Sequence, residues 1–236
     1  MTAFDRMALG VGLVFLTFKA LTTRRLAPAR ALGYWAFWPG MDSRPFARTV
    51  PGAGPGLFAW GLLKAGAGAA LLSVRAGVPA VDVARVFLGI GLLVHLGICD
   101  ALAGFWRMLG VPVDRLFVNP LASATLGEFW GRRWNLAFHA VAKDFVFRPA
   151  ARRWGPAAGV LLTFAFSGAL HEVLLSVPAA GGYGLPFAYF LLHGGLVLAE
   201  RRWGIGGRAW TLFWLLAPAP LLFHPWFVRA LIRPLI

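Results

Sequence analysis

The chain has 236 residues, of which 59% are hydrophobic and 14% charged, and its mean hydropathy is +0.70. A soluble domain of this length does not need so much apolar sequence, and several runs approach the ~20 residues that cross a hydrocarbon core. The composition therefore predicts an all-α, polytopic membrane protein. The single cysteine, Cys99, excludes an intramolecular disulfide and a cysteine-based metal cluster.

The net charge of +14 comes from arginines that cluster between the apolar runs, which makes a nucleic-acid partner improbable. Loops on the cytoplasmic side of a membrane carry an excess of Lys and Arg, and this excess sets the orientation. The clusters are Arg24, Arg25 and Arg30; Arg132 and Arg133; Arg152 and Arg153; and Arg201 and Arg202. With six spans they fall on one side, so we expect them to face the cytoplasm and both termini to face away.

Six apolar segments are expected to span the membrane within one domain, residues 1–236. They are roughly residues 6–22, 56–74, 84–109, 156–177, 185–200 and 208–224. The stretch "GYWAFWPGMDSRPF" lies between the first two segments, and it is aromatic and interrupted by prolines. Trp and Tyr favour headgroup depth, so this stretch is predicted to lie at the membrane interface.

A cytoplasmic amphipathic helix is expected between the third and fourth spans. "TLGE", residues 125–128, has the pattern of a capping box, in which a Thr caps the helix and a Glu three residues on reaches back. The helix is predicted to run through "FWGRRWNLAFHAVAKDFVF" and to end before Pro149. Asn135, His139 and Lys143 recur at i, i+4 and i+8 beside an apolar face. A helix that only anchors the loop to the leaflet is an equally open interpretation.

The fourth span carries two ionisable residues. His171 lies 15 residues from the start of segment 156–177, which places it roughly 22 Å into the membrane at 1.5 Å per residue. Thr163, Ser167 and His171 form one polar stripe on the helix. Glu172 is rotated about 100° from His171, on a face of small residues that lets a neighbouring helix approach. The candidate partners of Glu172 on other helices are Arg107, Lys64 and His193.

An ionisable residue inside a membrane is a functional hypothesis by default. Neutral histidine is the least costly of them to bury, and a neutral imidazole is what a general base needs. Two other interpretations stay open. His171 could be a hydrogen-bonded residue that joins helices, or, with Glu172, a proton relay in a transporter or channel.

Three stretches together resemble the wax synthase branch of the membrane-bound O-acyltransferase (MBOAT) superfamily. They are "NPLASATLGEFWGRRWN" (119–135), "TFAFSGALHE" (163–172) and "YFLLHGGLVLAE" (189–200). The likeness is densest over residues 119–200, the expected catalytic core, and weaker over "LTFKALTTRRLAP" and "WPGMD". "FWGRRWN" and "SGALHE", in this order and at this separation, make a specific pair.

The resemblance implies an MBOAT-like fold and transfer of a fatty acyl group from acyl-CoA to the hydroxyl of a lipid alcohol. The family histidine falls on His171 and the family asparagine on Asn135. His171 would act as general base, and Asn135 would donate to the oxyanion or position the thioester. The chemistry requires no cofactor beyond acyl-CoA as co-substrate, no metal, and no serine or cysteine nucleophile.

Further residues are candidates for substrate binding. They are Trp134, Arg132, Arg133, Ser167, Glu172, His193 and His139. The arginines suit the phosphates of CoA, although topology and lipid headgroups explain them equally well. His193 is expected to line the tunnel or support it, and His139 to share the entrance with Asn135.

Acyl-CoA, a lipid alcohol and membrane lipids are thus the expected partners. An MBOAT that acylates an exported glycan is a rival, but the loops on the far side are short and poor in polar residues. A transporter is disfavoured because the sequence shows no internal repeat. The arginine- and alanine-rich composition favours a multi-pass protein of a bacterial inner (cell) membrane.

Overall fold

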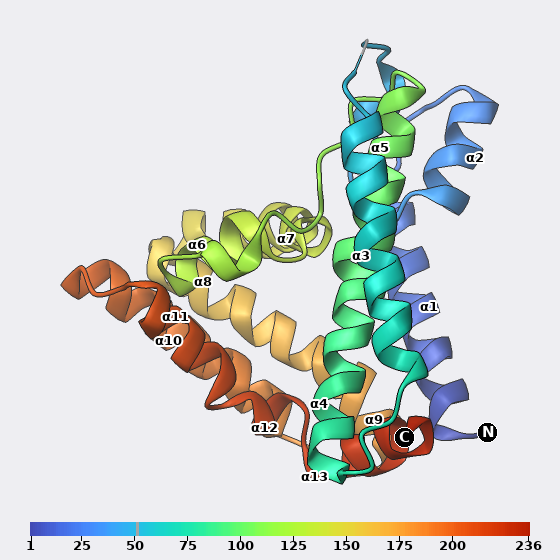
Figure 1. The fold of residues 1–236 in the computed structure, drawn as a ribbon. Helices are drawn as coiled ribbons and strands as arrows, with labels where there is room; N and C mark the ends of the chain where they lie inside the picture. Colours follow the sequence, from blue (N-terminus) through green and yellow to red (C-terminus); the bar gives the residue numbers. More distant parts are fainter. Residues whose placement is uncertain (51) are drawn as a thin grey trace. The chain divides into compact units, whose positions relative to one another are not determined.

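The structure is a computed structural model that describes residues 1–50 and 52–236. Helices and no strands occur in this part of the chain (Figure 1), which confirms the all-α prediction. The chain divides into two compact units. Unit 1 comprises Met1–Phe18, Asn119–Trp134 and Phe138–Pro234, and unit 2 comprises Lys19–Val118, Asn135–Ala137 and Leu235–Ile236.

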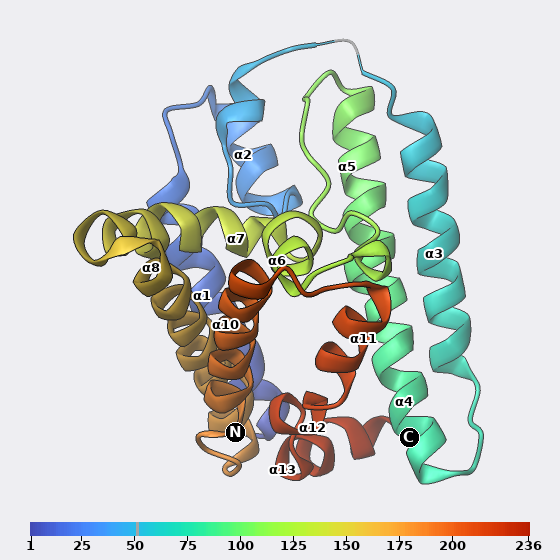
Figure 2. The same cartoon turned by 90° about the vertical axis from the view of Figure 1, so that its left-hand side faces the viewer.

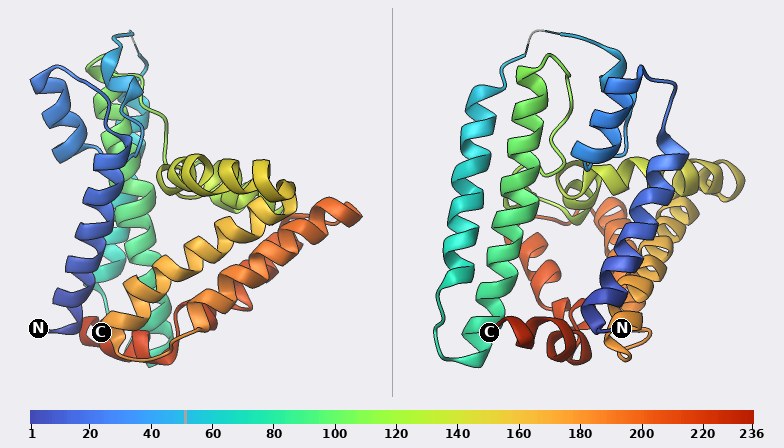
Figure 3. Two further views of the ribbon diagram at one scale, coloured as in Figure 1. Left: turned by 180° about the vertical axis from the view of Figure 1, so that it is seen from behind. Right: turned by 90° about the vertical axis from the view of Figure 1, so that its right-hand side faces the viewer.

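Unit 2 is built on two long antiparallel helical segments that lie side by side in Figures 1 and 3. The first is α3, and the second is a continuous rod of α4, a π-helical stretch and α5. The bounds are α2 Pro28–Phe37, α3 Pro55–Ser73, α4 Pro79–Ile90, π-helix Gly91–Ile98 and α5 Cys99–Met108. Glycines permit the close approach, because a Cβ at Gly61 would overlap the backbone of Ala101.

Buried ionic groups, among them Asp100 and Lys19, connect the segments of unit 2. The Asp100 carboxylate is almost fully buried; it accepts hydrogen bonds from the Arg115 guanidinium at 2.8 and 2.7 Å and from the Lys64 ammonium. Lys19 Nζ is fully enclosed and donates to three carbonyl oxygens, at distances of 2.6 to 2.8 Å. These oxygens belong to Tyr34, Trp38 and Gly40. Lys19 therefore anchors the aromatic "GYWAFWPG" stretch to the end of α1, Ala3–Thr22.

Unit 1 contains the segments that carry most of the motif residues. α8 and α10 pack along each other (Figure 2), around a core of Leu126, Val160, Phe164, Tyr189, Phe190, Val197 and Leu222. The α-helices after the loop are α6 Leu126–Glu128, α7 Leu136–Ala142, α8 Arg148–His171, α9 Val177–Ala179, α10 Leu185–Trp203, α11 Arg208–Leu216, α12 Ala219–Leu222 and α13 Pro225–Phe227. π-Helical turns at Phe129–Arg133, Lys143–Phe147, Glu172–Ser176 and Val228–Ile232 follow α6, α7, α8 and α13.

The prediction that the amphipathic helix ends before Pro149 is wrong. The helix continues through Pro149 into α8, and the break comes at Gly155, whose φ of 86° and ψ of 164° are non-helical. Pro149 follows the wide π-helical turn Lys143–Phe147, which relieves the clash that a proline ring makes inside a regular α-helix. Gly155 precedes Pro156, so the apolar arm starts where the fourth span was predicted to start.

Three helical segments of the described residues are long and apolar enough to cross a membrane: Pro55–Ser73, Pro79–Met108 and Leu136–Ala179. A fourth arises if the pair Arg208–Leu222 and Pro225–Leu235, bent by 65°, forms one span. These four correspond to predicted spans. The remaining two predicted segments fold as α1 and α10, each of which carries three charged residues.

Candidate active site

His171 lies near the end of the long apolar arm of α8, with its ring orientation fixed by its own helix. Its Nδ1 is 2.7 Å from the carbonyl oxygen of Ser167, one turn earlier. A carbonyl oxygen only accepts, so in the neutral imidazole the proton sits on Nδ1. Nε2 then keeps its lone pair, and it makes no hydrogen bond within the described part of the chain. The ring packs against Phe190 of α10, with ring centroids 4.3 Å apart.

The polar stripe predicted on this helix is present. Thr163 Oγ1 donates to the Gly159 carbonyl at 2.8 Å, and Ser167 Oγ donates to the Thr163 carbonyl at 3.1 Å. Both hydroxyl protons are therefore used within the helix, and each oxygen is left as an acceptor. A π-helical turn, Glu172–Ser176, begins directly after His171. Such turns occur frequently at functional sites.

Glu172 caps the start of α10, and within the described residues it forms no hydrogen bond or ion pair with a side chain of another helix. Its Oε1 accepts from the backbone N–H groups of Gly184 and Phe187, both at 3.0 Å. The predicted partners are engaged elsewhere: Lys64 with Asp100, Arg107 with the Val113 carbonyl, and His193 with the Trp214 carbonyl. Gly184 has no side chain to cap α10, so the carboxylate of Glu172 satisfies these N–H groups instead.

His193 is fully buried in α10 and braces two segments of unit 1. Its Nε2 lies 2.9 Å from the carbonyl oxygen of Trp214, so Nε2 carries the proton. Nδ1 is buried and has no hydrogen-bond partner in the described residues. The rings of Tyr189 and Trp130 lie 4.2 and 5.6 Å from it, centroid to centroid. Trp130 also lies 5.5 Å from Phe190, which connects this cluster to His171.

The predicted capping box is confirmed at the start of α6. Thr125 Oγ1 accepts from the Glu128 N–H at 2.9 Å, and Glu128 Oε2 reaches back to the N–H of Ala124 at 2.8 Å. Glu128 Oε1 binds Arg133 Nε at 2.7 Å, while Arg132 is exposed. The Ala124 N–H bond and the Arg133 guanidinium lower the pKa of the Glu128 carboxyl.

A second carboxylate, that of Glu200, holds the start of α6, and the sequence did not predict this role. Glu200 is buried in α10 and accepts from the N–H groups of Leu126 at 2.7 Å and Gly127 at 3.0 Å. It also accepts from Trp210 Nε1 at 2.9 Å. Glu200 therefore joins α6, α10 and α11. Its position in "LAERR" beside two arginines suggests a surface residue, so no sequence signal pointed to this role.

Asn135 breaks the helix that was predicted to contain it. Its φ of 46° is left-handed, and the N–H of Leu136 donates to the Leu116 carbonyl at 2.9 Å. Asn is one of the few residues that adopts this conformation readily. The prediction of a helical stripe through Asn135, His139 and Lys143 is therefore wrong. His139 is half-buried on α7.

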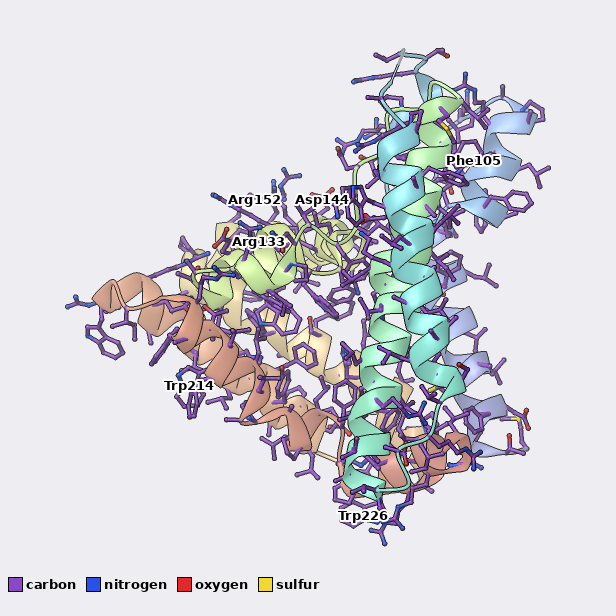
Figure 4. All side chains as sticks on the ribbon, viewed as in Figure 1. Phe105, Arg133, Asp144, Arg152, Trp214 and Trp226 are labelled. Atoms are coloured by element: carbon purple, nitrogen blue, oxygen red, sulfur yellow. The ribbon has the colours of Figure 1, made fainter. Side chains whose placement is uncertain are left out.

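The predicted site residues are divided between the two units of the chain. Asn135 lies in unit 2, and the others lie in unit 1. The ring of Trp134 stacks on Phe129, with centroids 5.4 Å apart and an interplanar angle of 14°. Figure 4 shows Arg133 in unit 1 on the same side as Asp144 and Arg152.

Residues 113–192 match the "Membrane bound O-acyl transferase family", which confirms the resemblance drawn from the motifs. The match contains Asn135 and His171.

Named relatives are plant proteins. The chain is 34% identical over 142 residues to "Probable long-chain-alcohol O-fatty-acyltransferase 2" of Arabidopsis thaliana, covering 52% of this chain and 41% of the relative. It is 31% identical over 143 residues to number 7 of the same series, covering 52% and 42%. It is 28% identical over 141 residues to "Long-chain-alcohol O-fatty-acyltransferase" of Simmondsia chinensis, covering 51% and 40%. The chain thus spans about two fifths of the length of these relatives.

Proposed function

We propose that the protein is a membrane-bound O-acyltransferase that moves a fatty acyl group from acyl-CoA to the hydroxyl of a lipid alcohol, with His171 as general base. One observation carries the proposal. The bond from His171 Nδ1 to the Ser167 carbonyl leaves Nε2 as the basic nitrogen of a half-buried imidazole. The match of residues 113–192 to the family and the names of the plant relatives support the same chemistry.

The reaction follows from the position of that proton. Nε2 of His171 removes the hydroxyl proton of the alcohol as its oxygen attacks the thioester carbonyl. The tetrahedral oxyanion collapses, the carbon–sulfur bond breaks and CoA leaves as its thiolate. The imidazolium returns the proton to this sulfur, so that the products are the ester and free CoA. Because the alcohol is the nucleophile, the protein need not supply one.

Other residues receive supporting roles in this proposal. Asn135 donates its amide to the oxyanion or positions the thioester. Arg132 and Arg133 meet phosphates of CoA, and Trp134 with His139 flanks the entrance. Ser167 and His193 line the path of the substrate. Glu172 acts through α10, since its carboxylate caps the helix that carries Phe190 and His193.

The arrangement in the membrane is also a proposal. We infer six spans, with α1 and α10 added to the four candidates, and arginine-rich loops on the cytoplasmic side. The charged residues of α1 and α10 lie near the ends of these helices, which leaves an apolar middle to span the hydrocarbon core. The arginine- and alanine-rich composition favours a bacterial inner membrane.

The test uses purified protein in detergent with labelled palmitoyl-CoA and four acceptors: hexadecanol, a sterol, diacylglycerol and water. The key variant is His171→Asn, because the Asn amide can still donate to the Ser167 carbonyl while the basic nitrogen is lost. Ester formed by the parent and lost in the folded variant supports the proposal, and the productive acceptor defines the alcohol class. A folded parent that makes no ester with any acceptor contradicts it and favours a transporter.

A further inference from the structure

A groove of about 550 Å³ lies in unit 1 at the kink of α8. Its walls come from the π-helical turn after α7, the first arm of α8 and the part of α8 beyond Gly155. The lining residues are Phe145, Val146, Pro149, Ala150, Arg153, Trp154, Leu162, Ala165 and Phe166. This size lies within the range of sites that hold small ligands.

The groove is apolar with one cation. Its lining contains no carboxylate, hydroxyl or amide side chain, and Arg153 is its only charged residue. Phe145, Trp154 and Leu162 are 49%, 64% and 41% exposed, so the groove is open along its length. An amphiphile with an apolar chain and an anionic head matches this combination.

The charges around the groove also lack internal partners. Within the described residues, Arg152 and Arg153 make no hydrogen bond or ion pair, whereas Arg148 is paired with Asp144 at 2.6 Å. Figure 4 shows Arg152 and Asp144 on the same side of unit 1. The guanidinium of Arg153 in the groove, and that of its chain neighbour Arg152, are therefore available to an external anion.

We propose that this groove binds an anionic glycerophospholipid of the surrounding leaflet. One acyl chain lies along Leu162, Ala165 and Phe166, and the phosphate meets Arg153 with Arg152 beside it. The exposed indole of Trp154 lies at headgroup depth, where Trp is favoured. The groove does not use the residues assigned to acyl transfer, so this proposal does not rest on the enzymatic one.

A phospholipid fits the groove better than acyl-CoA does. The head of CoA carries several phosphates and an adenine ring, which call for several cations and for hydrogen-bonding side chains. The lining offers one cation and no such side chain. A phospholipid head with a single phosphate matches one or two arginines.

The test is native mass spectrometry of the full chain with phosphatidylglycerol and phosphatidylcholine of identical acyl chains. Both lipids carry one phosphate, but the choline cation of phosphatidylcholine cancels its charge. We therefore expect anionic phosphatidylglycerol to bind about fivefold more tightly for each arginine near its head, since one such charge contributes about 1 kcal/mol. Arg153→Gln should lose about fivefold of this preference. Arg202→Gln is the matched control, because Arg202 is an exposed arginine at the end of α10 that lies outside the groove.

Ala165→Phe fills the groove without changing charge, so it should weaken binding of both lipids in protein with an unchanged melting temperature. Equal binding of both lipids, or an equal loss in Arg153→Gln and Arg202→Gln, overturns the proposal. Palmitoyl-CoA serves as competitor. If it displaces phosphatidylglycerol and its own binding is lost in Arg153→Gln, the groove is a donor site and the proposal is also overturned. The assay needs no turnover, so its outcome is separate from that of the ester assay.

Discussion

Half-buried His171 in α8 and fully buried His193 in α10 are two imidazoles with opposite hydrogen-bond arrangements. His171 donates from Nδ1 to a carbonyl of its own helix, and its Nε2 makes no hydrogen bond within the described residues. His193 donates from Nε2 to the Trp214 carbonyl, which lies 21 residues away in sequence, and its Nδ1 is enclosed by protein. A ring that is fixed locally leaves its far nitrogen available, whereas a ring that bridges two segments uses that nitrogen as a brace. In the proposed mechanism, the same residue type therefore serves as base in one place and as support in the other.

The largest expected effect separates these two histidines. His171→Asn introduces an amide that can donate to the Ser167 carbonyl, and His193→Gln introduces one that can donate to the Trp214 carbonyl. Each substitution removes the other ring nitrogen. Loss of a general base lowers kcat by about 10²- to 10⁴-fold, so we expect this loss in His171→Asn. His193→Gln should keep activity within about tenfold of the parent if its role is bracing.

The measurement is ester formation together with the apparent melting temperature in detergent. His171→Asn should lose turnover while melting close to the parent. The reverse pattern, an inactive His193→Gln and an active His171→Asn, would exchange the two roles. Both variants inactive at an unchanged melting temperature would show that His193 takes a direct part in the reaction.

Substitutions of Asn135 can distinguish a role of its side-chain amide from a role of its left-handed backbone conformation. Its φ of 46° favours glycine, so Asn135→Gly keeps the conformation while Asn135→Ala strains it by roughly 1–2 kcal/mol. If the amide stabilises the oxyanion, both variants lose about 10²- to 10³-fold in kcat. If the residue only shapes the chain, Asn135→Gly stays active and Asn135→Ala melts earlier. Rates measured at saturating acyl-CoA distinguish these outcomes.

Some features of the fold and the candidate site were predictable from local sequence patterns, and others were not. Local patterns of spacing predicted three features that the structure contains. They are the cap at Thr125, the start of the apolar arm at residue 156 and the polar stripe through Ser167. Asn135 was assigned to a helix because its spacing from His139 is helical, and periodicity carries no information about a left-handed residue.

Carboxylates that bind backbone N–H groups were harder still to predict. Glu172 and Glu200 both accept from N-terminal N–H groups of another helix, 12 and 15 residues away in sequence for Glu172 and 73 and 74 residues away for Glu200. Every non-proline residue carries the same N–H donor, so no residue type marks the partner in the sequence. The three basic side chains predicted as partners of Glu172 are therefore wrong, because its partners are backbone N–H groups.

Substitutions of Glu172 should have smaller effects, and they distinguish a role in capping α10 from a role in proton transfer. Glu172→Gln keeps a carbonyl oxygen that can accept from Gly184 and Phe187, while Glu172→Ala removes the cap. Loss of a helix cap costs about 0.5–2 kcal/mol, so we expect a lower melting temperature in the alanine variant and near-parental stability and activity in the glutamine variant. A glutamine variant that folds normally but makes no ester would show that the carboxylate takes part in proton transfer.

The smallest expected effect concerns pH and the start of α6. The pKa of Glu128 is lowered in the folded protein by the Ala124 N–H bond and by Arg133. Its stabilising contribution is therefore complete above the unfolded value of about 4.3 and is lost as pH falls through the lower folded value. The apparent melting temperature of the parent should thus fall more steeply below about pH 4.5 than that of Glu128→Gln. Asp144→Asn is the control, because the Asp144–Arg148 pair is exposed and such pairs contribute little. Equal slopes in the parent and Glu128→Gln would mean that the carboxylate does not hold the start of α6 in solution, and that Thr125 and Glu200 hold it without Glu128.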